Sequence, residues 1–310
     1  MANTLLAHCD WGRDPAKRWM AAAVRTEGVW QITRPELVGD TATLIDRLHD
    51  RRKEAGSVLI GFDFPIGLPT AYAKAAELPS FRQALSLLGH GQWADWFKVA
   101  GHHSEIGRHR PFYPMRPGGT NRAHLLKGHG LEELVHLLRE CERATPDRQA
   151  ACSLFWTLGG NQVGKGAIAG WQEVIIPNLA RIGLWPFDGS LTEVAEMSET
   201  IIAETYPGDV YHWIGIKRRA GWSKRRQSDR AGAGPILLDW IAARPVIDAQ
   251  AVSSAIQTGF DPGPAGEDQF DAMIGLLGMI AVVEGERGEG VPSQSLDILK
   301  WEGWILGHQR

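Results

Sequence analysis

Carboxylates interrupt apolar sequence at four places in this chain. Asp10, Asp63 and Glu204 each stand at or just after the end of a strand-like apolar run. Asp268 and Asp271 lie three residues apart at the start of a predicted helix and share one of its faces. If the three runs are parallel neighbours, their carboxylates gather at one edge of a sheet, where they repel one another unless a cation lies among them. Oxygen ligands without paired His or Cys favour Mg²⁺ or Mn²⁺, so the pattern predicts a metal site suited to phosphoryl displacement.

Each of these carboxylates also has a structural explanation. Asp10 could cap the turn that follows it, and Glu204 could pair with a basic side chain. Asp268 and Asp271 could only complement the N-terminus of their helix. Asp63 is the hardest to explain in this way, because its neighbours are apolar and a lone buried charge is costly. The combination indicates a site more strongly than any single member does.

Asp63 is positioned by the apolar run 58–62, which predicts a strand buried on both faces of a sheet. Pro65, Gly67 and Pro69 end this strand. The other expected strands cover residues 5–11, 18–26, 29–33 and 200–204. The expected helices cover residues 41–55, 80–98, 131–143, 167–182, 235–243, 248–258 and 267–284. Helical patterns dominate from residue 70 to residue 197, so this segment is predicted to be a large insertion.

Composition sets limits on the class of protein. The chain has 310 residues and a net charge of −3, so any contact with nucleic acid must be local. Its three widely spaced cysteines favour reduced thiols over a disulfide framework. The sequence has neither a signal-peptide pattern nor a run of the ~20 apolar residues that span a membrane. We therefore expect a cytoplasmic protein without membrane contact.

A basic stretch between residues 217 and 230 follows the carboxylate Glu204. Basic side chains around one aromatic residue, Trp222, suit a phosphate backbone and a stacked base, although a solvated helix face explains them equally well. We expect Lys224, Arg225, Arg226 and Arg230 to bind substrate phosphates. The other members of the stretch are Lys217, Arg218 and Arg219.

A glycine-rich loop over residues 159–166 nearly matches the phosphate-binding pattern G-x-x-x-x-G-K-[ST]. Its last position is Gly166, so the hydroxyl that would contact Mg²⁺ is missing. The loop could still bind an anion in front of a helix, with Gln162 and Lys165 touching the substrate. The alternative is a loop that only leads into the helix.

The order strand–strand–strand–helix–strand resembles the ribonuclease H-like fold. Asp10, Asp63 and the pair Asp268 and Asp271 resemble the acidic set of RuvC-type Holliday-junction resolvases. Several segments resemble more closely a family of predicted ribonuclease H-like nucleases that is known mainly as a domain of unknown function. These segments are GFDFPIGLP (61–69), ETYP (204–207), EDQFDA (267–272) and EGWI (302–305).

The resemblance implies a mixed sheet whose second strand is antiparallel, and a metal site on Asp10, Asp63 and Asp268 or Asp271. We therefore expect an α/β protein with a ribonuclease H-like mixed five-stranded sheet flanked by helices. Residues 1–69 and 198–310 would form this core, and the mainly helical insertion 70–197 would pack on it.

The expected function is that of a metal-dependent phosphodiester hydrolase acting on nucleic acid. Asp10, Asp63 and Asp271 would hold Mg²⁺ or Mn²⁺, with Asp268 and Glu204 beside them. One alternative is an enzyme for a small phosphorylated molecule or nucleotide. Another is a non-catalytic binding protein that retains the fold and whose carboxylates are salt-bridged.

Overall fold

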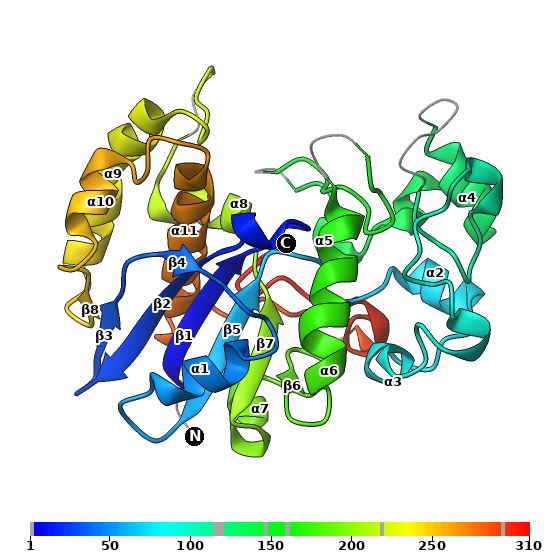
Figure 1. The fold of residues 1–310 in the computed structure, drawn as a ribbon, viewed down its shortest axis with the longest axis horizontal. Coiled ribbons are helices and arrows are strands. Elements are labelled where there is room, and N and C mark those ends of the chain that lie inside the picture. The colour runs from blue at the N-terminus through cyan, green and yellow to red at the C-terminus, as the bar shows by residue number, and fades with distance from the viewer. Residues whose placement is uncertain (1–2, 114–120, 146–147, 159–161, 218–219, 293–294) are drawn as a thin grey trace.

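The computed structural model describes residues 3–113, 121–145, 148–158, 162–217, 220–292 and 295–310. It is an α/β structure in which helices flank a mixed sheet of eight strands, as the sequence predicts for its class (Figure 1). The strands are β1 (Asn3–Asp10), β2 (Trp19–Thr26), β3 (Val29–Ile32), β4 (Glu36–Leu37), β5 (Ser57–Phe62), β6 (Gly183–Leu184), β7 (Thr200–Glu204) and β8 (Ile247–Asp248).

The strands follow the order β6-β7-β5-β1-β2-β3-β8, with β4 paired to β2. The five predicted strands, β1, β2, β3, β5 and β7, are neighbours in the middle of this order. β2 is antiparallel to β1, whereas β5 and β7 run parallel to β1. Three further strands of two residues each enlarge the expected five-stranded sheet. They are too short to produce a periodic signal in the sequence.

The helices are α1 (Leu44–Asp50), α2 (Thr70–Ala75), α3 (Phe81–Leu85), α4 (Ala123–His129), α5 (Val163–Gly170), α6 (Ile176–Asn178), α7 (Leu191–Met197), α8 (Pro207–Ile214), α9 (Gln227–Ala242), α10 (Ser253–Thr258) and α11 (Ala265–Val283). A π-helical turn, Trp171–Ile175, joins α5 to α6. A second π-helical turn covers Ile298–Glu302. Short 3₁₀ turns lie at Pro15–Lys17, Gly91–Trp93, His103–Glu105, Leu134–Leu137 and Glu140–Glu142.

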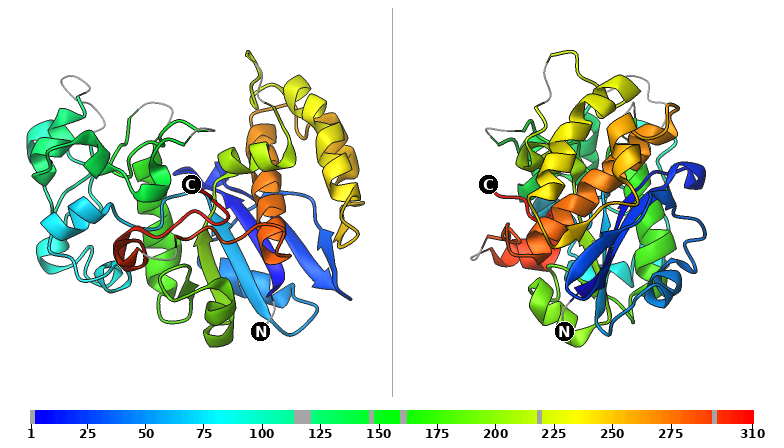
Figure 2. Two further views of the ribbon diagram at one scale, coloured as in Figure 1. Left: turned by 180° about the vertical axis from the view of Figure 1, so that it is seen from behind. Right: turned by 90° about the vertical axis from the view of Figure 1, so that its left-hand side faces the viewer.

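The alternation of side chains along the central strands divides the core in two. Val58, Ile60 and Phe62 of β5 pack in one apolar cluster with α1, α2, α3 and α5, whereas Leu59 packs in a second cluster with α8, α9 and α11. Figure 2 shows α11 lying against the sheet when the molecule is seen from behind. Both faces of the sheet are therefore covered, which explains why every residue of β5 is buried.

Two predicted helices of the insertion are wrong. The helix predicted over residues 80–98 ends as α3 at Leu85, because Gly89 and Gly91 have positive φ angles of 89° and 52° that a helix does not adopt. The helix predicted over residues 131–143 is replaced by two 3₁₀ turns. The amide of Glu140 donates to the Glu302 carboxylate instead of a helical carbonyl, so a tertiary contact overrides the local pattern.

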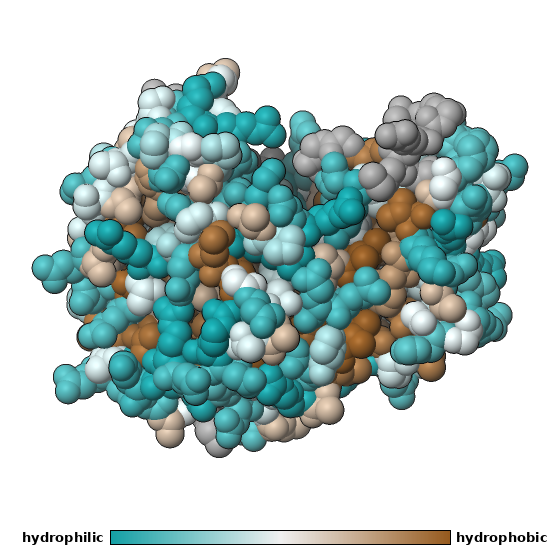
Figure 3. All heavy atoms as spheres, viewed as in Figure 1, coloured by the Kyte–Doolittle hydropathy of each residue, from teal (hydrophilic) through white to brown (hydrophobic). Residues whose placement is uncertain are grey.

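The helix predicted over residues 41–55 is also shorter than expected. It forms as α1, and the amide of Arg51 closes it by donating to the carbonyl of Leu48. None of the helices in the described part of the chain is long and apolar enough to cross a membrane. On the face drawn in Figure 3, hydrophilic side chains predominate and hydrophobic ones show mainly in a band beside α5 and α6.

Candidate functional site

Asp10 and Asp63 lie side by side at the carboxyl ends of β1 and β5. Cys9 of β1 is in register with Phe62 of β5, so each aspartate follows one member of that pair. Cys9 and Phe62 both point into the cluster that holds α1 and α5. Because successive side chains alternate, Asp10 and Asp63 point to the other face of the sheet, towards α11.

The backbone around Asp63 holds its side chain in place. The amide of Trp11 donates to Asp63 Oδ1 at 2.7 Å, so the turn after β1 fixes the carboxylate that follows β5. A Cβ atom on Gly61 would lie 2.7 Å from Met279 Sδ of α11. Glycine at this position therefore lets the helix approach the strand closely beside the site.

Asp10 and Asp63 are both harder to ionise than an ordinary carboxyl group. Burial raises the pKa of Asp63 to about 7, although the hydrogen bond from Trp11 lowers it. Burial also raises the pKa of Asp10 well above its usual value, and the negative charges of Asp63, Asp271 and Asp268 add to the effect. Asp10 and Asp63 lie within hydrogen-bonding reach of each other, so one proton can be shared between them. A cation would replace that proton at neutral pH.

The first half of α11 brings Asp268 and Asp271 to the same place. Asp271 is 4% exposed and accepts hydrogen bonds from the hydroxyl of Tyr211 and from Lys224 Nζ. Burial, together with the charges of Glu267 and Asp271, raises the pKa of Asp268 to about 6. The predicted four-aspartate set therefore forms one electrostatic cluster, which we call the aspartate cluster: Asp10, Asp63, Asp268 and Asp271.

Lys224 supplies positive charge to the aspartate cluster. Its Nζ forms an ion pair with Asp271 and lies 3.3 Å from Glu267 Oε1. Burial lowers the pKa of the Lys224 ammonium, but the carboxylates of Asp271, Asp10 and Glu267 together outweigh burial and raise this pKa above its usual value. Lys224 was expected to contact substrate phosphates, whereas in the structure it compensates a cluster carboxylate.

The donor atoms of the aspartate cluster suit a hard divalent cation, but their positions fit it only in part. Among the described residues, no group of three or more His, Cys, Asp or Glu side chains is placed to hold one ion. Asp10 and Asp63 provide paired carboxylates, while Asp271 is occupied by Lys224. A cation would thus bind to Asp10 and Asp63 and gain Asp271 only when Lys224 moves away.

A cavity of about 390 Å³ opens beside the aspartate cluster. Asp63 and Asp271 lie in its wall with the aromatic residues Tyr206, Tyr211 and Trp222. The rings of Tyr211 and Trp222 meet edge to face, with centroids 5.8 Å apart. The cavity therefore combines carboxylates with aromatic surfaces on which a planar group could stack.

The basic stretch after α8 divides between this cavity and the protein interior. Arg225 has an 80% exposed side chain, lines the cavity and lies 3.7 Å from Glu267. Arg226 is half exposed and pairs with Asp229 at 2.5 Å. Arg225 is thus available to a substrate, whereas Arg226 is partly occupied by its ion pair with Asp229 in the first turn of α9. Arg218 and Arg219 lie outside the described residues.

Arg230 has a structural environment. Its side chain is fully buried, and its three guanidinium nitrogens donate to the backbone carbonyls of Gly259, Lys224 and Asp261 at 2.6–2.8 Å. These bonds fasten the start of α9 to the loop before α11. The carbonyl of Lys224 is one of the acceptors, so Arg230 helps to position the lysine that pairs with Asp271.

Gln162 and Lys165 lie at the same end of the sheet as the aspartate cluster. A Cβ atom on Gly166, one residue after Lys165, would lie 3.9 Å from the carbonyl oxygen of Trp11, which follows Asp10. Lys165 Nζ donates to Gln162 Oε1 at 2.7 Å, and burial lowers the pKa of its ammonium group. The first residues of the glycine-rich loop, Gly159, Gly160 and Asn161, lie outside the described residues.

Glu204 is separated from the aspartate cluster by the sheet itself. It is in register with Phe62 and therefore points to the face that carries α1 and α5, opposite to Asp63. There Arg139 binds both of its carboxylate oxygens, at 2.7 and 2.6 Å. The structure thus does not bring Glu204 to the other four carboxylates. It pairs with a basic side chain, the structural explanation considered for it above.

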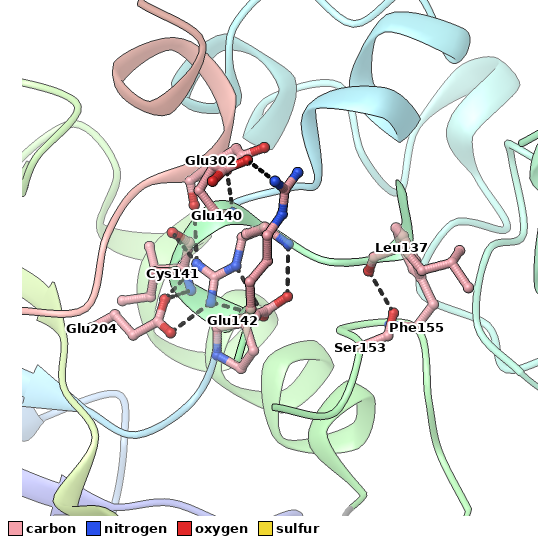
Figure 4. A network of polar contacts seen from close by, with 12 residues as sticks. Leu137, Glu140, Cys141, Glu142, Ser153, Phe155, Glu204 and Glu302 are labelled. Atoms are coloured by element: carbon pink, nitrogen blue, oxygen red, sulfur yellow. Dashed lines mark hydrogen bonds and ion pairs between the residues drawn. The ribbon is translucent and has the colours of Figure 1, made fainter. Parts of the chain in front are cut away.

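Buried polar groups form a network around Arg139, in which Figure 4 labels Glu142, Glu204 and Glu302. Glu142 accepts from Arg139 Nε at 3.0 Å, and the amide of Ile66 donates to Glu204 at 2.7 Å. Glu302 accepts from the amides of Thr70 and Glu140 at 3.1 and 2.6 Å. We call this set the Arg139 network: Arg139, Glu142, Glu204 and Glu302.

Three of the four segments that carry the family resemblance meet at the Arg139 network. Gly67 has a φ of 144°, and a Cβ atom there would lie 1.9 Å from the carbonyl oxygen of Glu302, so only glycine fits. The amide of Leu306 in turn donates to the carbonyl of Glu204 at 2.8 Å. These segments therefore have a shared structural role where distant parts of the chain meet at the Arg139 network.

Sequence reasoning missed Tyr211, whose hydroxyl donates to Asp271. Nothing in the pattern of α8 distinguishes this tyrosine from other core aromatics. No protein-family model, curated protein or solved structure matches this chain. A function for this chain must therefore be inferred from the geometry of its own residues.

Proposed function

We propose that this protein is a divalent-metal-dependent phosphodiester hydrolase of the ribonuclease H-like type. The proposal rests on the pair Asp10 and Asp63 at the ends of adjacent parallel strands. Burial raises the pKa of both carboxyl groups, and the charge of Asp63 raises that of Asp10 further. Within the described residues, the nearby ammonium of Lys224 pairs with Asp271 instead. Such a pair gains most from a bound cation.

Asp10, Asp63 and Asp271 would hold the cation, with Asp268 beside them. A divalent cation at such a site activates water and stabilises the negative charge of the leaving oxygen. Arg225, which is exposed at the mouth of the cavity, would attract a phosphate, and Trp222 would stack on a base. Lys224 would hold Asp271 in place until a cation binds.

The arrangement of the strands supports this proposal. The resemblance of the sequence to ribonuclease H-like nucleases implies that the second strand is antiparallel and that the acidic residues lie on the first and fourth predicted strands. The antiparallel pairing of β1 with β2, and the parallel pairing of β1 with β5, agree with that implication. Glu204 would have no part in the chemistry, because Arg139 occupies both of its oxygens.

A second candidate is an enzyme acting on a small phosphorylated molecule. The volume of the cavity, about 390 Å³, is in the range of pockets that enclose one small ligand. A mononucleotide that competes with single-stranded DNA or RNA for the same site, and is itself hydrolysed faster, would favour this candidate.

The decisive experiment is a calorimetric titration of Mn²⁺ into the wild-type protein and into Asp63→Asn. We expect the substitution to weaken binding about tenfold or more, since it removes one charged ligand. Asp46→Asn is the matched control, because Asp46 is an exposed carboxylate of α1 that pairs with Arg181. It should bind Mn²⁺ like the wild type.

Activity is then measured on labelled single-stranded DNA and RNA with Mn²⁺ present. Asp63→Asn should lose the activity that Asp46→Asn retains. Identical Mn²⁺ isotherms for the wild type and Asp63→Asn would refute the metal site and favour a non-catalytic binding protein.

A further inference from the structure

Two basic and two acidic side chains lie together in the wall of the cavity beside the aspartate cluster: Lys224, Arg225, Glu267 and Asp271. Lys224 Nζ pairs with Asp271 and lies 3.3 Å from Glu267 Oε1. Arg225 Nε lies 3.7 Å from Glu267 Oε2. The side chain of Lys224 is 40% exposed and that of Arg225 is 80% exposed, so both are open to the solvent at the cavity. Two cations thus balance two carboxylates in this wall.

The two carboxylate oxygens of Asp271 have different partners. The hydroxyl of Tyr211 donates to Oδ1, and Lys224 Nζ donates to Oδ2. Because Tyr211 holds Oδ1, Oδ2 is the oxygen through which Asp271 would bind a metal ion. An ammonium and a divalent cation at one oxygen repel each other strongly in a buried environment, and Asp271 is buried. Lys224 and a metal ion therefore exclude each other at Asp271.

The backbone of Lys224 is held in place, whereas its side chain can turn. The carbonyl of Lys224 accepts from Arg230 Nη1 at 2.6 Å. The amide of the preceding residue, Ser223, donates to Asp229 Oδ2 at 2.8 Å. The lysine side chain itself is a flexible four-carbon chain with one compact charge at its end. Since Glu267 already lies 3.3 Å from Nζ, an ammonium released from its first partner keeps a second one in the same wall.

We propose that Lys224 is a latch on the metal site. It holds Asp271 in the metal-free protein, and it turns away towards Glu267 when a divalent cation binds. The latch rests on the proposed function, because Asp10 and Asp63 would bind the cation that releases it. It adds to that function an internal competitor, which weakens the binding of metal ions and keeps the buried carboxylate of Asp271 neutralised in their absence.

Release of the latch changes the charge of the cavity wall. In the metal-free protein, Lys224 neutralises Asp271, and Arg225 neutralises Glu267. Once a metal ion neutralises Asp271, two basic side chains face the single carboxylate of Glu267. The wall then carries a surplus positive charge beside the metal site, which attracts a phosphate group. The binding of metal and of substrate is thereby coupled through Lys224.

The first test is a calorimetric titration of Mn²⁺ into the wild-type protein and into Lys224→Met. The substitution removes the competitor, so we expect Mn²⁺ to bind about tenfold more tightly, as it would if Asp271 were free about one-tenth of the time in the wild type. Lys17→Met is the matched control. Lys17 is exposed and its charge also acts on the aspartate cluster, at Asp268, but it forms no ion pair among the described residues. This control should tighten binding less than about threefold.

The second test measures how fast acetic anhydride acetylates Lys224 in the wild-type protein, first with EDTA and then with saturating Mn²⁺. Peptide mass spectrometry gives the rate at each lysine. An amine held in an ion pair reacts slowly, so release should raise the rate at Lys224 several-fold. Lys98 is the internal control, because it is exposed and pairs with Asp95 at 2.6 Å, and its rate should not change. This measurement decides even if Lys224→Met does not fold.

Either an unchanged Mn²⁺ affinity in Lys224→Met or an unchanged acetylation rate at Lys224 would overturn the latch. If Mn²⁺ binds to the wild type in that case and Asp63→Asn weakens the binding, the proposed function stands without the latch. Binding of Mn²⁺ to Lys224→Met but not to the wild type would support the latch, because the competitor alone then blocks the site. If neither protein binds Mn²⁺, the latch and the metal site are both refuted.

Discussion

The aspartate cluster and the Arg139 network both begin with a carboxylate at the end of a parallel strand. Asp63 follows β5, and Glu204 ends the neighbouring strand β7. Both carboxylate oxygens of Glu204 accept hydrogen bonds from a guanidinium, and one of them also accepts from a backbone amide. Asp63 accepts one hydrogen bond from a backbone amide, has a raised pKa and lies beside a second carboxylate. Within one sheet, complete pairing thus marks a structural carboxylate, and incomplete pairing marks a candidate for chemistry.

The two sites also differ in what their removal should do. The Arg139 network joins segments that are far apart in the chain, because Arg139 contacts Glu204 of β7 and donates to the carbonyl of Glu302. The aspartate cluster holds like charges together at the edge of a cavity, which opposes folding. Substitutions in the two sites should therefore change stability in opposite directions.

The largest effect is expected from Arg139→Met. It leaves Glu204 and Glu142 buried without their cation, so the free energy of unfolding should fall by about 3–5 kcal/mol. Urea denaturation measures this loss. Arg181→Met, which breaks an exposed pair with Asp46, is the control and should change little. A loss no larger than that of the control would mean that the Arg139 network is not a structural junction.

A smaller effect of opposite sign is expected from Asp63→Asn without divalent cations. Asparagine retains the acceptor for the Trp11 amide but removes a charge from the aspartate cluster. The free energy of unfolding should rise by about 1 kcal/mol at a pH of about 8. A clear loss of stability would instead place Asp63 in a structural ion pair.

The difference in the free energy of unfolding between Asp63→Asn and the wild type should depend on pH. The pKa of Asp63 is raised in the folded state to about 7, so its proton stabilises the fold below the ordinary carboxyl pKa, and this contribution is lost as the pH rises to about 7. Buried His8 and His129, with pKa values lowered to about 3 and 4, act in the opposite sense. Subtracting the wild-type pH profile of the free energy of unfolding from that of Asp63→Asn cancels the contribution of the two histidines. The difference should grow between pH values of about 4 and 7, and a flat difference would contradict the raised pKa.

The smallest effect on stability is expected from Arg225→Gln, because this side chain is 80% exposed. Its effect should appear instead in binding to single-stranded nucleic acid. The slope of log affinity against log salt should become shallower by about one when one phosphate contact is lost. Lys98→Met is the control, because Lys98 is an exposed lysine that pairs with Asp95 at 2.6 Å. An unchanged slope in Arg225→Gln would remove this residue from the path of the substrate.

The central strands and the long last helix could be predicted from sequence because their signals are local and strong. The run 58–62 is apolar throughout, and α11 has a long apolar pattern closed near Val283. The two-residue strands β4, β6 and β8 carry no such signal. The predicted helices of residues 80–98 and 131–143 failed because positive φ angles and tertiary hydrogen bonds override helix propensity.

The aspartates of the candidate site could also be anticipated, but the grouping of all five carboxylates could not. The alternation of side chains along a strand explains why Glu204 lies apart from Asp63. Asp63 lies one residue beyond the position in register with Glu204, so the two side chains point to opposite faces of the sheet. The register itself is a tertiary fact. The exposed position of Arg225, against the buried one of Arg230, likewise depends on how the loop before α9 folds.

The sequence by itself determined the α/β class, the central strands and the presence of acidic residues at their ends, since these follow from short-range apolar patterns. Only the tertiary structure decided which carboxylates share a site and which cation each one meets. The partners of Glu204 and Asp271, namely Arg139, Lys224 and Tyr211, come from distant segments of the chain. Pairing and burial set the charge state of a carboxylate, and both depend on contacts that no local pattern encodes.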